Sequence, residues 1–276
     1  MICSPYDLDA RYGTKRDQSW IGYKAHLTET CDPNAPRLIT NVTTTSATVL
    51  DVATTAPIQE ALAEHDRLPD VHFLDAGYVD AELLVTSQSK HQVTLCGPAM
   101  VETSWQARAG KGFAASAFEI DWQARQATCP KGQSSTGWKS GVDRNGNEVV
   151  KIAFADRVCG SCASRSDCTR AVSAGRELTI RTEAAHTALQ AARREQAGPE
   201  FWEMYKLRAG IEGTISQGVR RCDLRQARYR GEAKTHLQNV LVATALHLVR
   251  VIAWLMETPL AATRRSRFAA LVPTCV

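Results

Sequence analysis

The sequence predicts an α/β (α+β) fold, in which a mixed sheet is flanked by helices and interrupted by a small β-rich insertion that carries cysteines. Three observations indicate this class. Runs of β-branched and aromatic residues alternate with helical patterns over the first hundred residues. Residues 98–195 are dense in turn signals and contain four cysteines, and the pattern becomes helical from Thr182 onward. With 276 residues, 44% of them hydrophobic, the chain can bury a large core.

These shifts divide the chain into five segments. We expect an irregular N-terminal segment, the first part of the main domain, the cysteine-containing insertion with a connecting helix, the second part of the main domain and a tail, at residues 1–17, 18–97, 98–195, 196–258 and 259–276. The main domain is thus predicted to consist of two stretches that the insertion separates.

The first part of the main domain begins with a predicted hairpin, because two β-branched runs flank the turn-forming segment 32–36. Farther on, a short apolar run ends in Asp75-Ala76-Gly77, which is typical of a buried central strand that presents a carboxylate at its C-terminal end. In order, the expected elements are strands 20–30 and 38–45, helix 57–68, strand 71–75, a helix from Asp80 and strand 91–96.

The rest of the chain is predicted to be helical after one more hairpin. Asn145-Gly146 is a strong hairpin signal, and strand 148–154 follows it. Helices are expected at 183–196, 199–219 and 231–257. Spacings of three and four residues place one set of side chains on a single face of the second helix: Phe201, Tyr205, Arg208, Glu212 and Ile215. Polar residues interrupt the third helix, which we interpret as a buried core helix and not a membrane span.

Positive charge is concentrated toward the C-terminus. The formal net charge is +4, while residues 193–267 alone hold 14 Lys and Arg against 7 Asp and Glu. This excess indicates a polyanionic partner such as nucleic acid, or else a solvated helical surface. The first residues show no signal-peptide pattern, and nine cysteines, an odd number, favour reduced thiols in the cytoplasm.

Asp75 and Glu212 are candidate metal ligands. Carboxylate oxygens suit hard divalent cations such as magnesium, and two such ions can assist phosphoryl transfer. Each acid also has a plain alternative, since Asp after a strand often forms a turn and Glu on a helix is usually solvated. On the same helical face, Tyr205 and Arg208 could hold a DNA phosphate, or Arg208 could simply pair with Glu212. The magnesium hypothesis requires the two carboxylates to converge in space.

A basic run with an interleaved aromatic residue, Tyr229, follows this helix. Such a run fits a surface that tracks phosphates, and the alternative is a solvated face. Its candidate DNA-binding residues are Arg220, Arg221, Arg225, Arg228, Arg230 and Lys234.

These segments resemble the DDE transposases of bacterial insertion sequences, in the branch with a cysteine-bearing insertion before the glutamate helix. The resemblance covers nearly the whole chain and rests on Gly22-Tyr23-Lys24-Ala25-His26-Leu27, Asp75-Ala76-Gly77-Tyr78, Tyr205-x2-Arg208-x3-Glu212, residues 212–220 and residues 228–235. It implies an RNase H-like fold, with Asp75 and Glu212 as the second and third acids of a triad that binds Mg²⁺ or Mn²⁺. It also implies cleavage of transposon-end DNA, joining of the 3′-hydroxyl to target DNA, and a location at the nucleoid in the cytoplasm.

The chain departs from this family's pattern at two places. Where the family's signature has a lysine, seven residues after Glu212, this chain has Val219, and Arg220 is the nearest substitute. The family's first aspartate, on a strand before Gly22, has no counterpart among Asp7, Asp9, Asp17, Asp32 and Asp51. We therefore expect an N-terminally truncated transposase, which also lacks the family's helical domain for binding DNA ends.

Four cysteines of the insertion have the spacing C-x29-C-x2-C-x5-C: Cys129, Cys159, Cys162 and Cys168. Four thiolates can close a tetrahedral structural zinc site, and the C-x2-C pair is typical of one. The x5 spacing is unlike a standard zinc ribbon, so simply reduced thiols remain the alternative. A zinc ion would hold together a small insertion that has little core of its own.

Three functions are compatible with these observations. The first is metal-dependent DNA cleavage and strand transfer, which we expect to be weak or absent in this chain alone because one acid is missing. The second is a non-catalytic DNA-binding module or a remnant that pairs with full-length transposase or with itself. The third is a structural zinc protein without a nucleic-acid role.

Overall fold

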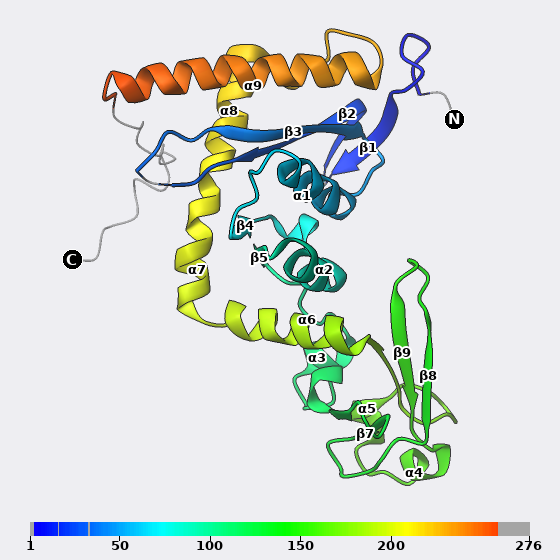
Figure 1. Ribbon diagram of the computed structural model, residues 1–276. Coiled ribbons are helices and arrows are strands. Elements are labelled where there is room, and N and C mark those ends of the chain that lie inside the picture. Colours follow the sequence, from blue (N-terminus) through cyan, green and yellow to red (C-terminus); the bar gives the residue numbers. More distant parts are fainter. Residues whose placement is uncertain (1–2, 16, 33, 259–276) are drawn as a thin grey trace, which may run out of the picture. The chain divides into compact units, whose positions relative to one another are not determined.

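The computed structural model describes residues 3–15, 17–32 and 34–258, which divide into two compact units (Figure 1). Unit 1 combines the residues up to Thr48 with those from Gly210, and unit 2 runs from Val49 to Ala209. The mixture of helices and small sheets agrees with the predicted α+β class. The described strands form four sheets of two or three strands. Two of them lie in the predicted insertion, and the strands outside it form two small sheets in place of the one mixed sheet that we expected. The predicted tail, 259–276, lies outside the described residues.

Unit 1 contains an antiparallel sheet and two helices: β1 (Arg11–Lys15), β2 (Gln18–Glu29), β3 (Ile39–Ser46), α8 (Gly210–Cys222) and α9 (Glu232–Leu255). The predicted hairpin is confirmed, because Tyr23–Glu29 of β2 pairs antiparallel with β3. The N-terminal half of β2 pairs with β1, which corrects the prediction of an irregular segment at 1–17. Tyr12 and Thr14 suit a strand once β2 offers them an edge.

Helix α9 packs along β3, as Figure 1 shows. The face toward the sheet is buried and includes Val242, Ala243 and the fully buried Leu246, which form a cluster with Ile39. The expectation of a buried core helix is confirmed for this face only, because a second apolar face is exposed. The exposed face comprises Leu237, Leu241, Leu248, Ile252 and Leu255. By length and composition α9 could cross a membrane, although a core helix passes the same test.

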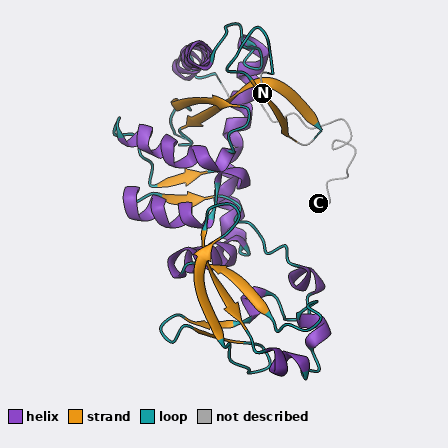
Figure 2. Ribbon diagram, turned by 90° about the vertical axis from the view of Figure 1, so that its right-hand side faces the viewer, coloured by secondary structure: helices purple, strands orange, loops and turns teal. Residues whose placement is uncertain are grey.

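Unit 2 begins with two helices and a parallel strand pair (Figure 2). Its elements here are η1 (Asp51–Thr54), α1 (Thr55–Ala63), β4 (Val71–Phe73), η2 (Ala76–Tyr78), α2 (Ala81–His91) and β5 (Thr94–Cys96). Helix α1 ends at Ala63, five residues before its predicted end. Shortly after it, Asp66 has a positive φ of 52°, which is incompatible with a helix. Strand β4 pairs only with β5 among the described strands, so it is not the central strand that we expected.

The insertion contains the predicted β-rich structure. It comprises α3 (Trp105–Ala109), η3 (Ala115–Ala117), β6 (Glu119–Asp121), β7 (Gln126–Thr128), β8 (Gly137–Val142), β9 (Glu148–Ala153), α4 (Asp156–Gly160), α5 (Arg165–Cys168) and β10 (Glu177–Arg181). The Asn145-Gly146 turn joins β8 to β9 as predicted, and β10 completes a three-stranded antiparallel sheet. Ile152 is fully buried in the core of this sheet, with Phe154 and Leu178 around it.

Three segments follow the insertion within unit 2: α6 (Glu183–Gln196), α7 (Pro199–Tyr205) and η4 (Lys206–Ala209). The first matches its predicted bounds. The prediction of one continuous helix over 199–219 is wrong, because the 3₁₀ segment η4 separates α7 from α8. Gly210 opens α8, and a side chain there would require the Arg37 guanidinium to move.

Candidate functional site

Asp75 follows β4 at the C-terminal end of the strand, where the sequence placed it. Its Oδ1 accepts a hydrogen bond of 2.8 Å from the amide of Ala76 and thereby caps η2. The carboxylate itself is half exposed, with 51% of the side chain accessible. The strand end therefore fixes the backbone of Asp75 and leaves its second oxygen at the surface.

Close packing of backbone supports this turn. The Leu74 amide donates to the Cys96 carbonyl at 2.9 Å, which extends the β4–β5 pairing up to Asp75. Directly beyond β5, a Cβ on Gly97 would lie 2.6 Å from the Leu74 carbonyl oxygen. Only glycine permits that approach, so the position of Asp75 depends on Gly97.

Arg208 lies next to Asp75 within unit 2. Its Nη2 is 3.6 Å from Asp75 Oδ2, and the arginine side chain is 20% exposed. The guanidinium also lies 5.8 Å from the ring centroid of Tyr205, which stacks on Phe201. The structure thus brings together the second predicted acid and the Tyr-x2-Arg part of the signature.

Tyr78 and Asp51 complete the surroundings of Asp75. Burial raises the pKa of Tyr78 above its ordinary value, and the carboxylates of Asp51 and Asp75 act in the same direction, while Arg208 opposes them. The Thr55 hydroxyl donates to the Tyr78 carbonyl at 2.7 Å and ties this turn to α1. In the sequence, Asp51 stands out only as an acid that lacks the strand context of the family's first aspartate. Its position beside Tyr78 had no signal in the sequence, because it arises from tertiary packing.

Glu212 belongs to unit 1, in the first turn of α8, and its side chain is exposed. A carboxylate there is favoured by the positive end of the helix dipole. Two residues later Thr214 is fully buried and donates to Glu29 at the end of β2. Asp75 and Glu212 therefore lie in different units, and their convergence stays a prediction.

A buried ion pair anchors the helix that carries Glu212. Arg250 of α9 donates to Glu29 Oε2 at 2.9 Å, and the two side chains are 15% and 5% exposed. The same guanidinium donates to the Arg37 carbonyl at 3.0 Å and to Gln217 Oε1 of α8 at 3.2 Å. One arginine thus joins α9 to β2 and α8.

The predicted DNA-binding residues of unit 1 lie on α8, on the loop between α8 and α9, and at the start of α9. All six are exposed: Arg220, Arg221, Arg225, Arg228, Arg230 and Lys234. Two of them have partners within the chain. Arg228 Nη2 forms an ion pair with Asp223 at 2.8 Å, and Arg220 Nη2 donates a hydrogen bond to Ser216 Oγ at 2.7 Å. Tyr229 is 52% exposed among them. The segment presents cationic and aromatic groups to solvent, as a phosphate-binding surface requires.

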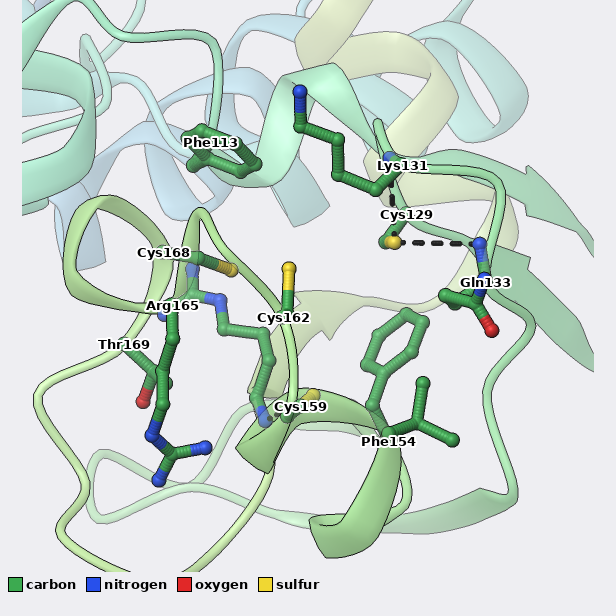
Figure 3. A pocket seen from close by; sticks show the side chains of 12 residues that line it. Phe113, Cys129, Lys131, Gln133, Phe154, Cys159, Cys162, Arg165, Cys168 and Thr169 are labelled. Carbon is green, nitrogen blue, oxygen red and sulfur yellow. Dashed lines mark hydrogen bonds between the residues drawn. The ribbon is translucent and has the colours of Figure 1, made fainter.

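The four cysteines of the insertion line one small cavity of about 30 Å³ (Figure 3). Burial raises the pKa of the Cys168 thiol, and Arg176 opposes this shift, while the other three thiols add to it. The four cysteine side chains come from separate segments and lie around this one space. Across the residues that the structure covers, no group of three or more His, Cys, Asp or Glu side chains is arranged to hold a metal ion.

Part of the chain matches a known protein family. The family described as the transposase DDE domain matches residues 128–252, somewhat under half of the chain. This range contains the four cysteines, the Tyr205–Glu212 segment and the basic run, and it excludes Asp75. No curated protein and no solved structure matches the chain. Over residues 128–252 the chain is thus similar to the transposase DDE domain, and this similarity supports a DDE transposase with a role related to transposition.

Proposed function

We propose that the chain is a component of a DDE transposase of an insertion sequence, which binds DNA at the nucleoid and holds Mg²⁺ or Mn²⁺ through Asp75 and Glu212. The observation that carries the proposal is the match to the transposase DDE domain, which contains Glu212 and the basic run. Asp75 lies outside the match, and its ion pair with Arg208 links it to the Tyr205-x2-Arg208-x3-Glu212 signature. The expected DNA partners are transposon ends and target DNA, and the expected protein partner is full-length transposase or a second copy.

The chemistry of both acids fits a divalent cation. Each presents a solvent-accessible carboxylate, and magnesium prefers such oxygens, with water and substrate phosphate completing its shell. When bound, the cation would activate an attacking oxygen and stabilise a leaving oxygen during phosphoryl transfer. Asp75 and Glu212 would supply negative charge at fixed backbone positions, one at a strand end and the other in the first turn of a helix.

The neighbouring side chains would position DNA. Arg208 holds Asp75 across 3.6 Å in a pair that is partly exposed, so the pair itself is worth only about 0–1 kcal/mol. A DNA phosphate can therefore recruit the guanidinium at little cost, with Tyr205 stacking beside it. We assign the charge of the missing signature lysine to Arg220, which Ser216 orients from one turn earlier.

Iron-directed cleavage of the polypeptide tests the metal proposal without relying on catalysis. Fe²⁺ would replace Mg²⁺, and hydroxyl radicals generated with ascorbate and peroxide would cut the backbone near the bound ion. We expect cuts beside both Asp75 and Glu212 that excess Mg²⁺ suppresses. Asp75→Asn should weaken the cuts at both positions, whereas Glu203→Gln, which alters an exposed acid of α7 paired with Lys206, should change neither. If neither excess Mg²⁺ nor Asp75→Asn changes the cuts, a metal site shared by Asp75 and Glu212 is excluded.

Salt-dependent binding tests the DNA interface. A fluorescent duplex should bind with an affinity that falls steeply with salt, because each phosphate contact contributes about −0.9 to the slope of log K against log salt. The double variant Arg225→Ala/Arg230→Ala should lower that slope by about two. Lys139→Ala, an exposed cation of β8, serves as the control and should leave the slope unchanged. Binding that is insensitive to both salt and the double variant would contradict the interface.

A non-catalytic DNA-binding or transposase-partner remnant is the second candidate, and the exposed basic run favours it. Its signature is salt-dependent DNA binding together with an absence of iron-directed cuts. Under the first candidate, we still expect little strand-transfer product from the isolated chain with Mn²⁺, since no residue here is assigned as the first acid. Robust product from the isolated chain would refute that expectation and would show that another residue, such as Asp51, serves as the third ligand.

A further inference from the structure

We propose that Cys129, Cys159, Cys162 and Cys168 bind one structural zinc ion, which holds together the end of the insertion. Three separate segments supply these residues: the turn after β7, helix α4 with its following turn, and the last residue of α5. All four line the same cavity, whose volume of about 30 Å³ is large enough for a single ion or water. In Figure 3 the four cysteine side chains lie around this one space. As described, no three of them are arranged to hold an ion, so zinc binding requires the four sulfurs to draw closer together.

Backbone amides donate hydrogen bonds to two of the four sulfurs. The amides of Lys131 and Gln133 each donate to Cys129 Sγ at 3.4 Å, and the amide of Arg176 donates to Cys159 Sγ at the same distance. The chain wraps around Cys129 in a tight turn, in which the Gly132 amide donates to the Cys129 carbonyl at 2.8 Å. Such contacts orient a metal ligand and offset its charge, as outer-shell hydrogen bonds do around known metal sites.

Positive charge lines the same cavity. Four thiolates around Zn²⁺ leave a net charge of −2, which needs compensation in a partly buried place. Lys131, Arg165 and Arg176 are all among the lining residues. Their charge would disfavour an additional free cation but complements an anionic zinc–thiolate centre.

The local structure also lacks another source of stability. Helices α4 and α5 have five and four residues, and neither has a buried residue. Helices this short do not persist without tertiary support. The apolar core of the insertion lies in the β8–β9–β10 sheet, around Ile152, and Cys129, Cys159 and Cys168 only border it. A metal that joins these segments would supply the missing constraint, and a full set of four protein ligands indicates a structural role.

Metal content and cobalt spectroscopy of the full chain test this inference, which is independent of the proposed DNA chemistry. Protein expressed with zinc and purified without chelator should contain one Zn²⁺ per chain by mass spectrometry of the elements. Replacement with Co²⁺ should give the intense visible absorption of a tetrahedral thiolate site. Cys162→Ser should lower zinc retention at least tenfold under dialysis, whereas Cys222→Ser, a cysteine of unit 1, should retain one zinc.

Chelation of the unaltered protein guards against a variant that fails to fold. Removal of zinc should expose residues 155–175 to trypsin, which cuts after the arginines there, and added zinc should restore protection while β8–β10 stay protected throughout. Folded protein without zinc, a brown iron–sulfur chromophore, or disulfides in place of four free thiols would each overturn the proposal.

Discussion

Replacing Arg250 with methionine should destabilise unit 1 strongly. The variant keeps a long side chain but leaves the carboxylate of Glu29, which is 5% exposed, without its ionic partner. Breaking a buried pair from one side costs about 3–5 kcal/mol, because the remaining charge stays desolvated. The loss also removes the hydrogen bonds from Arg250 to the Arg37 carbonyl and to Gln217. Replacing both partners, in Glu29→Met/Arg250→Met, should recover much of the loss, since an apolar pair needs no compensation.

Hydrogen exchange followed by mass spectrometry measures the stability of unit 1 separately from that of unit 2. A two-unit protein need not unfold in one step, so a global melting curve would mix the units. Amides of α8 should exchange about a hundred to a few thousand times faster in Arg250→Met, which corresponds to 3–5 kcal/mol at about 1.4 kcal/mol per decade. Lys90→Met breaks an exposed pair with Glu60 in unit 2 and should leave the exchange of the α8 amides unchanged. A loss below about 1 kcal/mol in Arg250→Met, or no recovery in the double variant, would refute the reasoning.

Three further predictions concern unit 2. Burial lowers the pKa of His72 to about 4, below its unfolded value, so its contribution to stability is complete above pH 6.5 and is lost as the pH falls toward 4. Over this window the free energy of opening of β4, measured by hydrogen exchange, should fall by about 3 kcal/mol more in the natural protein than in His72→Leu. Gly97→Ala should cost about 1–3 kcal/mol, seen as faster hydrogen exchange in β4 and β5, and should weaken the iron-directed cut at Asp75, because its Cβ would press on the Leu74 carbonyl. Its control is Gly213→Ala in unit 1, which has open space around it and should leave exchange in α8 unchanged or slower. Ile152→Ala should cost about 2–5 kcal/mol, visible as faster exchange confined to β8–β10.

Local patterns predicted most elements of the fold. The β2–β3 hairpin, the Asn145-Gly146 turn and helix α6 were all predicted, because each depends on residues close in sequence. Features that depend on partners far along the chain were not. Strand β1 needs the edge of β2, and the break at η4 precedes a glycine whose neighbour is Arg37, more than a hundred residues away.

The candidate site divides in the same way. The position of Asp75 after a strand was predicted correctly from a short apolar run. Its ion pair with Arg208 could not be predicted, because the two residues are separated by the whole insertion. The Glu29–Arg250 pair was also missed, since buried charges carry no periodic signal and both residues look like ordinary surface residues in sequence. The exposure of the outer face of α9 was not predicted, because an apolar helix pattern does not show how many faces of the helix pack against other elements.

The two carboxylates depend on separate structural supports, and this has a practical consequence. Asp75 is held by backbone contacts of unit 2, above all the approach of Gly97 to Leu74, whereas Glu212 sits on a helix that the Arg250 network fixes in unit 1. A substitution in one of these two sets of contacts should therefore displace the carboxylate that it supports. Hydrogen-exchange rates in the other unit should stay unchanged. Loss of function with slow exchange in both units would then implicate the carboxylate chemistry itself, because neither support would have failed.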